Sequence, residues 1–370
     1  MENLVENLPF FSNNMLQYTS FKKMEILIII YISIIYRKLL RGISTCRKKG
    51  TIPWSQENYY GRIIDWIVEE LDKVNLRVQG NIKHIKETDL TLLLRVPTNE
   101  DNYYFKAVGS VLKFEAALSK ELYRKCPERT GDILAINETE GWLLMKDFKG
   151  QPLRIQKDKK LWQKAIGDYA ELQISQIGNV DKFLQIGVPD RRMPILKEEI
   201  NQYLEEMCLT GLSKEETNQI LSLLPILLEM CDEMASNIPA SIEHGDLHTN
   251  NIRIVENKFV FFDWGDASIS HPFFSTRVFW HALDNLISSE TEWLGMVEEF
   301  RPYYLEPWTR FGSMKEIDKT LRISDELACI QRALSWHLYI TPNRQDKSDS
   351  NHKPSQWLRL LLEHRTLLGK

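Results

Sequence analysis

Hydrophobic residues along the chain recur at two kinds of spacing, one typical of helices and one typical of strands, and their order divides the chain into two parts. Over residues 60–74, apolar side chains recur every three or four positions, which predicts an amphipathic helix. Short apolar or alternating runs follow and predict strands at residues 76–78, 90–96, 103–108, 133–136 and 142–148. A helix expected over residues 111–125 separates the third of these strands from the fourth. This order of elements indicates a small antiparallel lobe.

After Gly150 the helical spacing dominates. Long helical patterns cover residues 161–177, 193–207 and 214–234, and a last helix is expected over 356–368, after a polar stretch at 342–355. One short β-hairpin interrupts them at 252–262. The predicted fold is therefore α+β, with a small β-rich N-terminal lobe and a larger, mainly helical C-terminal lobe.

The composition is that of a soluble globular protein and narrows the classes of partner. The chain has 370 residues, of which 43% are hydrophobic and 26% charged, and this length favours two domains or two lobes. A net charge of −4 gives no reason to expect a nucleic-acid partner. The five cysteines are scattered and form no CxxC pair, so neither a zinc site nor a disulfide framework is expected. A reducing, cytoplasmic location fits this pattern best.

The first fifty residues differ from the rest. They carry eight Lys or Arg and three Glu, and they contain an apolar run of eleven residues at positions 26–36. A helix of that length would measure about 16 Å, roughly half the hydrocarbon core of a bilayer. The segment could be an interfacial anchor that makes weak membrane-surface contact through residues 22–49, the result of a start codon assigned too far upstream, or an extra element of the body. None of these alternatives decides the function.

The segment 244–274, HGDLHTNNIRIVENKFVFFDWGDASISHPFF, carries the strongest chemical signal. Asp246 and Asn251 lie five positions apart in a polar loop, and the predicted hairpin follows directly. Because a hairpin returns its second strand to the start of the first, Asp263 is expected beside Asn251. Such oxygen ligands suit Mg²⁺ rather than zinc. Phosphoryl transfer needs this kind of cluster, with one base to orient the nucleophile. Neither a P-loop motif nor a GxGxxG motif occurs in the chain.

The pattern His244-x-Asp246-x-x-x-x-Asn251, followed by an Asp-Trp-Gly turn at Asp263, resembles the catalytic and metal-binding loops of the aminoglycoside phosphotransferase/choline kinase family. Members of this family have a two-lobed fold like that of protein kinases. The resemblance implies that Asp246 is the base, that Asn251 and Asp263 hold Mg²⁺ on the nucleotide phosphates, and that His244 supports the loop. It covers about residues 51–340.

The same resemblance assigns a nucleotide site to the N-terminal lobe. Lys106, in the strand YYFKAV, is similar to the family's phosphate-binding lysine, and Glu115 looks like its ion-pair partner. Glu121 is the alternative partner, because the phase of the helix is not fixed by the sequence. Residues 139–153 resemble the hinge, where backbone groups at 145–147 would meet a purine. Residues 83–90 take the place of the phosphate-covering loop but contain no glycine, which leaves Thr88 or Thr91 for that role.

These assignments imply an N-terminal extension at 1–50, a nucleotide-binding lobe at 51–148 and a catalytic, acceptor-binding lobe at 149–370. The implied activity is transfer of the γ-phosphoryl group of ATP or GTP, with Mg²⁺, to a hydroxyl of a small molecule such as an aminoglycoside, an amino alcohol or a sugar-like compound. A small acceptor is favoured because no long activation segment follows Asp263. Two alternatives stay open: a catalytically silent nucleotide-binding scaffold of the same fold, and a membrane-tethered kinase for a lipid-linked alcohol.

Overall fold

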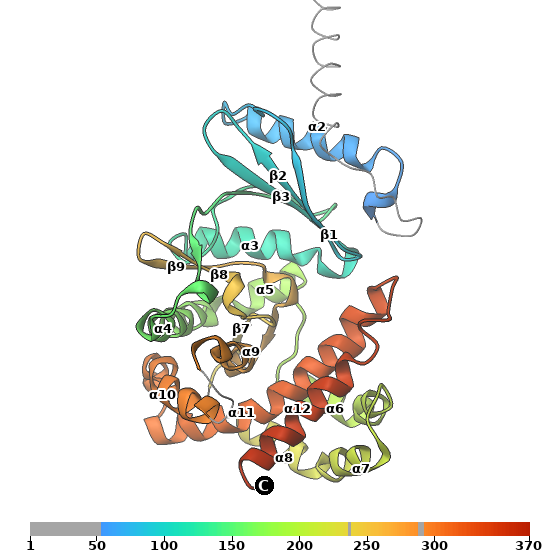
Figure 1. Ribbon diagram of the computed structural model, residues 1–370, viewed down its shortest axis with the longest axis vertical. Helices are drawn as coiled ribbons and strands as arrows, with labels where there is room; N and C mark the ends of the chain where they lie inside the picture. The colour runs from blue at the N-terminus through green and yellow to red at the C-terminus, as the bar shows by residue number, and fades with distance from the viewer. Residues whose placement is uncertain (1–52, 236–237, 288–291) are drawn as a thin grey trace, which may run out of the picture.

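A computed structural model describes residues 53–235, 238–287 and 292–370. The basic and apolar segment at residues 1–50, with the predictions made for it, lies outside these ranges. Figure 1 shows two lobes: an antiparallel sheet with one helix on either side, and a larger group of helices beneath it. This is the α+β architecture that the hydrophobic spacing predicts. Within the described ranges, no helix is long and apolar enough to cross a bilayer.

Five antiparallel strands form the sheet of the N-terminal lobe, in the order β1-β2-β3-β5-β4. They are β1 (Lys83–Glu87), β2 (Thr91–Pro97), β3 (Asn102–Val108), β4 (Ile133–Asn137) and β5 (Trp142–Lys146). In β2, Leu92, Leu94 and Val96 are fully buried while the residues between them are partly exposed, as the two-residue period of a strand requires. This buried face packs against the apolar side of α2 (Tyr59–Asp72), which lies across the top of the sheet in Figure 1.

The other face of the sheet looks toward the C-terminal lobe. α3 (Phe114–Lys125) crosses it after the short helix η2 (Ser110–Leu112), and Ala116 of α3 packs on Ile133 and Leu143 of the sheet. α3 thus separates the sheet from the helical lobe over part of this face, and the rest of the face is left to border a cavity between the lobes.

Two predictions for this lobe are wrong in detail. Residues 76–78 form no strand, and a single bridge between Val78 and Thr98 connects them to the sheet. The first strand is β1, in the stretch 83–90 that we interpreted as the phosphate-covering loop. Four of the five β1 residues are exposed, so the strand lacks the apolar alternation by which strands are recognised. Only residues 88–90 remain as the turn between β1 and β2.

Helices build the C-terminal lobe. They are α4 (Lys159–Gln176), α5 (Val180–Ile186), α6 (Met193–Cys208), α7 (Lys214–Ser222), α8 (Leu224–Met234), α9 (Ser275–His281), α10 (Trp293–Leu305), α11 (Met314–Leu334) and α12 (Lys353–Leu367). The single helix expected over 214–234 is in fact two helices that meet at Leu223. Pro225 explains the break, because proline lacks the N–H that a helix interior needs and is accommodated at a helix start.

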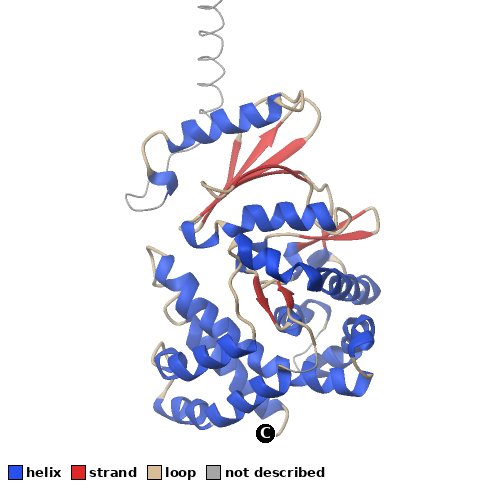
Figure 2. Cartoon of the chain, turned by 180° about the vertical axis from the view of Figure 1, so that it is seen from behind, coloured by secondary structure: helices blue, strands red, loops and turns tan. Residues whose placement is uncertain are grey.

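Two short sheets hold the segment with the chemical motif. β8 (Ile252–Val255) and β9 (Lys258–Phe261) form the predicted hairpin, and β6 (Gln151–Pro152) pairs with its edge. β7 (Ser241–Glu243) pairs with β10 (Ser268–Ser270), one strand before the hairpin in sequence and one after it. Figure 2 shows both small sheets in red, below the large sheet. The pairing of β7 with β10 brings the two ends of the motif segment together.

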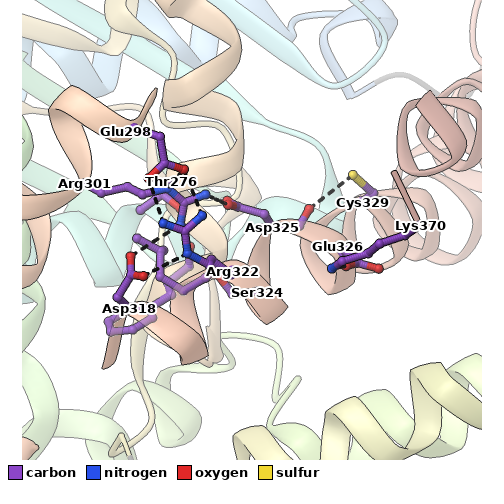
Figure 3. A network of polar contacts seen from close by, with 12 residues as sticks. Thr276, Glu298, Arg301, Asp318, Arg322, Ser324, Asp325, Glu326, Cys329 and Lys370 are labelled. Carbon is purple, nitrogen blue, oxygen red and sulfur yellow. Dashed lines mark hydrogen bonds and ion pairs between the residues drawn. The ribbon is translucent and has the colours of Figure 1, made fainter. Parts of the chain in front are cut away.

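Buried ion pairs tie the helices of this lobe to one another (Figure 3). Arg301 of α10 contacts Asp325 of α11 at 2.5 Å, and both side chains are buried. The next residue on α11, Glu326, is fully buried and contacts Arg365 of α12 and, at 2.5 Å, Lys370. Because a buried charge is costly without a partner, these contacts oppose displacement of α12 from α11.

Candidate active site

Lys106, in β3, lies between two carboxylates that come from different lobes. Its Nζ is 2.5 Å from Glu115 Oε1 and 2.5 Å from Asp263 Oδ1, and the lysine side chain is buried. Glu115 belongs to the first turn of α3, so the structure fixes the helix phase that the sequence leaves open. Glu121, the alternative partner, contacts Arg124 at 2.7 Å instead.

The ion pairs shift the pKa values of their members. Burial by itself would lower the pKa of Lys106, but the charges of Asp263 and Glu115 outweigh it and raise that pKa above its ordinary value. The Lys106 charge in turn holds the pKa of Asp263 below its usual range, against the effect of burial. Lys106 is therefore cationic and Asp263 anionic at neutral pH.

The β8–β9 hairpin brings the backbone at Asn251 next to the backbone that leads into Asp263. The Phe262 N–H donates to the Asn251 carbonyl at 3.2 Å, and the Asn251 side-chain amide donates to the Asp246 carbonyl at 3.0 Å. Asp263 has a φ of 68°, a left-handed conformation that is uncommon for a non-glycine residue. Such strain is concentrated at functional sites, and here it aims the carboxylate at Lys106.

His244 connects the two halves of the motif. Its Nε2–H donates to the Phe262 carbonyl at 3.1 Å, and its Nδ1 accepts the Asp246 N–H at 3.3 Å. The ring is fully buried and lies 4.5 Å from the ring of Trp264. Burial lowers the pKa of His244 to about 4, so the imidazole is neutral and can donate at one nitrogen while it accepts at the other. His244 thus joins the backbone of Asp246 to the backbone beside Asp263.

Gly245 permits a close approach within this loop. Its φ is 77°, and a Cβ atom there would lie 2.0 Å from the Asp266 carbonyl oxygen. Only glycine fits such a position without a shift of the backbone. The Gly245 N–H donates at 2.7 Å to the buried carboxylate of Glu243, and this hydrogen bond fixes the loop to the end of β7.

Asp246, like Asp263, is a partly exposed carboxylate. Its side chain is 35% exposed, and its Oδ2 lies 3.4 Å from His248 Nε2. Burial raises the pKa of Asp246, and the nearby charge of Arg332 opposes that rise. Arg332 itself contacts Asp266 at 3.4 Å. Asp246 therefore combines access from solvent with a fixed backbone, which is the geometry a proton acceptor needs.

A cavity of 480 Å³ between the lobes is lined by Lys106, Glu115 and Asp263. The predicted hinge borders it as well, through Met145 and residues 147–150. In the hinge the Lys146 N–H donates to the Asp132 carbonyl at 2.9 Å, and the Asp147 N–H donates to the Asn102 carbonyl at 3.0 Å. Among the described residues, nothing accepts a hydrogen bond from the Phe148 N–H.

Several residues that line the cavity were not predicted from the sequence. Ile85 and Lys86 come from β1, Tyr104 from β3 and Arg253 from β8. Tyr104 lies two positions before Lys106 in β3, so the two side chains face the same side of the sheet. This spacing is the one sequence signal that could have identified Tyr104. The others occupy strands whose exposed faces carry no pattern. Thr91 lines the cavity, whereas Thr88 does not.

Asn251 and Asp263 offer the hard oxygen ligands that Mg²⁺ prefers. In the parts of the chain that the structure describes, no group of three or more His, Cys, Asp or Glu could hold a metal by itself. Mg²⁺ commonly keeps several waters and uses one or two carboxylates together with substrate phosphates. This donor set therefore fits a metal that binds together with a nucleotide rather than a metal centre enclosed by protein.

Comparisons with known proteins bear on this arrangement. Residues 81–300 match the model of a family described as "Phosphotransferase enzyme family". No protein of curated function gives a significant match.

Solved structures resemble the chain in fold. A GDP complex of a mutant aminoglycoside 2'-phosphotransferase-IIIa has a TM-score of 0.57 at 14% identity, over 82% of this chain and 97% of that one. Choline kinase from Streptococcus pneumoniae has a TM-score of 0.54 at 14% identity, over 81% and 99%. Macrolide 2'-phosphotransferase type I has a TM-score of 0.54 at 10% identity, over 80% and 96%. At these identities the likeness concerns the fold alone.

Proposed function

The chain belongs to the phosphotransferase enzyme family, and on that premise we propose that it transfers the γ-phosphoryl group of ATP or GTP, with Mg²⁺, to a hydroxyl of a small molecule. The observation that carries the proposal is the position of Lys106, which joins Glu115 of the sheet lobe to Asp263 of the helical lobe at the wall of the cavity. A buried cation at this place can neutralise phosphate charge, and phosphoryl transfer depends mainly on such neutralisation and on positioning.

Each residue of the group then has a role. Lys106 contacts the nucleotide phosphates, and Glu115 holds the ammonium in place. Asn251 and Asp263 bind Mg²⁺, which neutralises charge on the phosphates when it is present. Asp246 accepts the proton of the acceptor hydroxyl. His244 holds the backbone of Asp246 in place relative to the backbone of Phe262, because its ring is hydrogen-bonded to both.

The hinge suggests how a purine is bound. The N–H groups of Lys146 and Asp147 donate within the protein, while the N–H of Phe148 has no acceptor among the described residues. Phe148 also lines the cavity, so its N–H is the group that we expect to meet the purine. Both ATP and GTP can accept such a bond.

For the acceptor we propose a small alcohol of the aminoglycoside, amino alcohol or sugar-like classes. The part-exposed Asp246 carboxylate can receive a hydroxyl group without an opening of the fold. The alternative function, a silent nucleotide-binding scaffold, is less favoured because Lys106, Glu115, Asp246, Asn251 and Asp263 are all present and the first two form the ion pair that a working site needs.

Calorimetric titration with ATP and with GTP, each with and without Mg²⁺, tests the proposal. Binding by the wild type should depend on Mg²⁺, and Asp263→Ala should lose that dependence. The matched control is Asp232→Ala, which removes an aspartate of α8 whose side chain is 65% exposed and does not line the cavity. This variant should bind nucleotide as the wild type does.

A screen of alcohols and antibiotics for nucleoside diphosphate release tests the reaction itself. Asp246→Asn should bind nucleotide normally and lose transfer by about 10²- to 10⁴-fold, the usual contribution of a general base. Full turnover by Asp246→Asn would remove that residue from the mechanism. Failure of the wild type to bind either nucleotide would refute the proposed activity and favour the scaffold.

A further inference from the structure

Strand β1 contains a bulge beside the cavity. His84 pairs with Leu94 and Lys86 pairs with Leu93, so Ile85 has no partner of its own on β2. Successive residues of a regular strand face opposite sides of the sheet, but Ile85 and Lys86 both line the cavity. Bulges redirect side chains in this way and occur often beside active sites.

The turn between β1 and β2 sets which residue faces the cavity. The Thr88 N–H donates to the Thr91 carbonyl at 2.8 Å, and Glu87 pairs with Leu92. Lys86 therefore lies opposite Leu93, and directly paired residues project from the same face of a sheet. Since Leu93 lines the cavity, the register itself directs Lys86 toward it.

Most backbone N–H groups of the same turn are already engaged in hydrogen bonds. The Thr88 hydroxyl accepts the N–H groups of Leu90 and Thr91, at 3.2 and 3.1 Å, and the Thr88 N–H is also used. A glycine-rich loop covers the phosphates in protein kinases, and this turn contains no glycine. Apart from the Asp89 N–H, the phosphates of a bound nucleotide would thus need side-chain donors on this side.

Among the described lysines that line the cavity, Lys86 is the one without an ion-pair partner. Lys106 already contacts Glu115 and Asp263, and Lys149 contacts Asp101 at 2.7 Å. Within the described ranges, Lys86 forms no ion pair and no side-chain hydrogen bond.

We propose that Lys86 binds the phosphate groups of the nucleotide from the β1 side, in place of a glycine-rich loop. The bulge serves this purpose by presenting an apolar side chain, Ile85, and an ammonium group on the same face. Ile85 is 49% exposed, and a nucleotide in the cavity would cover part of it. This inference rests on the proposed function, because it requires a nucleoside triphosphate in the cavity.

The test compares phosphate-bearing and phosphate-free ligands in the presence of Mg²⁺. Calorimetric or competition titrations use ATP, ADP and adenosine, or the guanosine series if GTP binds more tightly, with the wild type, Lys86→Met and Lys86→Arg. Lys83→Met is the matched control, because Lys83 is an exposed lysine of the same strand that does not line the cavity. Lys86→Met should weaken triphosphate binding about tenfold or more, the usual size of one charge-assisted contact, and leave nucleoside binding unchanged. Lys86→Arg should recover part of the loss, and Lys83→Met should match the wild type.

Other outcomes separate this inference from the function on which it rests. If the wild type binds the triphosphate and Lys86→Met binds it equally well, the role of Lys86 is wrong while the proposed function stands. If Lys86→Met loses triphosphate and nucleoside binding in equal proportion, the lysine supports the strand rather than the phosphates, and the inference is again overturned. If the wild type binds no nucleotide, both proposals fail together.

Discussion

The carboxylate of Asp89, at the tip of the β1–β2 turn, accepts the backbone N–H of Gln345 at 3.0 Å. It also accepts the N–H of Asp346 at 3.2 Å. Asp89 belongs to the sheet lobe, and the other two residues lie between α11 and α12 in the helical lobe. The turn between β1 and β2, whose neighbours Lys86 and Thr91 line the cavity, is therefore held from the opposite lobe.

Asp89→Ala should loosen the turn without unfolding the protein. An exposed hydrogen bond of this kind contributes about 1 kcal/mol, so the apparent affinity for nucleotide should fall about fivefold. Nucleotide titration, together with limited proteolysis of residues 344–352, measures the effect. Asp72→Ala, at an exposed aspartate at the end of α2, should change neither quantity. Equal affinity in Asp89→Ala and the wild type would mean that the contact between the lobes has no part in binding.

Glu115 and Glu121 provide a matched pair of substitutions in one helix. Glu115→Gln removes one of the two carboxylates that contact Lys106, and displacement of a positioned group commonly lowers turnover by about 10²-fold. Glu121→Gln breaks only the surface contact with Arg124 and should leave turnover within about twofold of the wild type. Turnover with saturating nucleotide and acceptor is the measurement. A similar loss in both variants would point to damage to α3 as a whole rather than to release of Lys106.

His271 predicts a loss of stability in acid. Burial lowers its pKa from 6.5 to about 3, because the ring lies among aromatic side chains and only its Nδ1 has a partner, the Phe273 N–H. Below pH 6.5 the imidazole of His271 is protonated in the unfolded chain but stays neutral in the folded chain. The free energy of unfolding therefore falls as the pH drops from about 6.5 toward 3. Between pH 7.5 and pH 4 the loss should reach about 3 kcal/mol.

Urea denaturation of His271→Asn over the same pH range checks this assignment. Asparagine keeps the hydrogen-bond acceptor but cannot ionise, so the variant should be less stable than the wild type at pH 7.5 and lose less stability on acidification. His352→Asn, at an exposed histidine before α12, should follow the wild-type pH profile. Parallel profiles for the wild type and His271→Asn would assign the acid sensitivity to another group.

Arg365→Met should destabilise the helical lobe. Glu326 is fully buried, and this change leaves its carboxylate with Lys370 as its partner in the ion pair. Loss of one partner of a buried pair typically costs about 3 kcal/mol in the free energy of unfolding. A further Glu326→Gln substitution should recover part of that loss, because it removes a buried charge that has lost one of its two partners. Arg359→Met, which breaks a solvent-exposed pair on the same helix, should have a much smaller effect, and equal losses would argue against a special role for the buried carboxylate.

Elements with two faces of different polarity were the ones that could be predicted. α2, β2 and the β8–β9 hairpin each follow their expected period, because one side of each packs on a core. β1 was missed since most of its residues face solvent or the cavity. The break between α7 and α8 lies within a continuous apolar period, and Pro225 was its only sign.

For this protein the sequence by itself determined the chemical groups and their order: the lysine of β3, the acidic and amide residues of the 244–263 segment, and the hairpin that brings Asn251 toward Asp263. Spacing and turn chemistry are local properties, so they can be read without knowledge of distant segments. Only the tertiary structure decided the partners. It selected Glu115 over Glu121, directed Lys86 into the cavity and joined Asp89 to Gln345. These choices depend on the rotation of a helix about its axis, on strand register and on the docking of two lobes, all of which are set by packing between residues far apart in the chain.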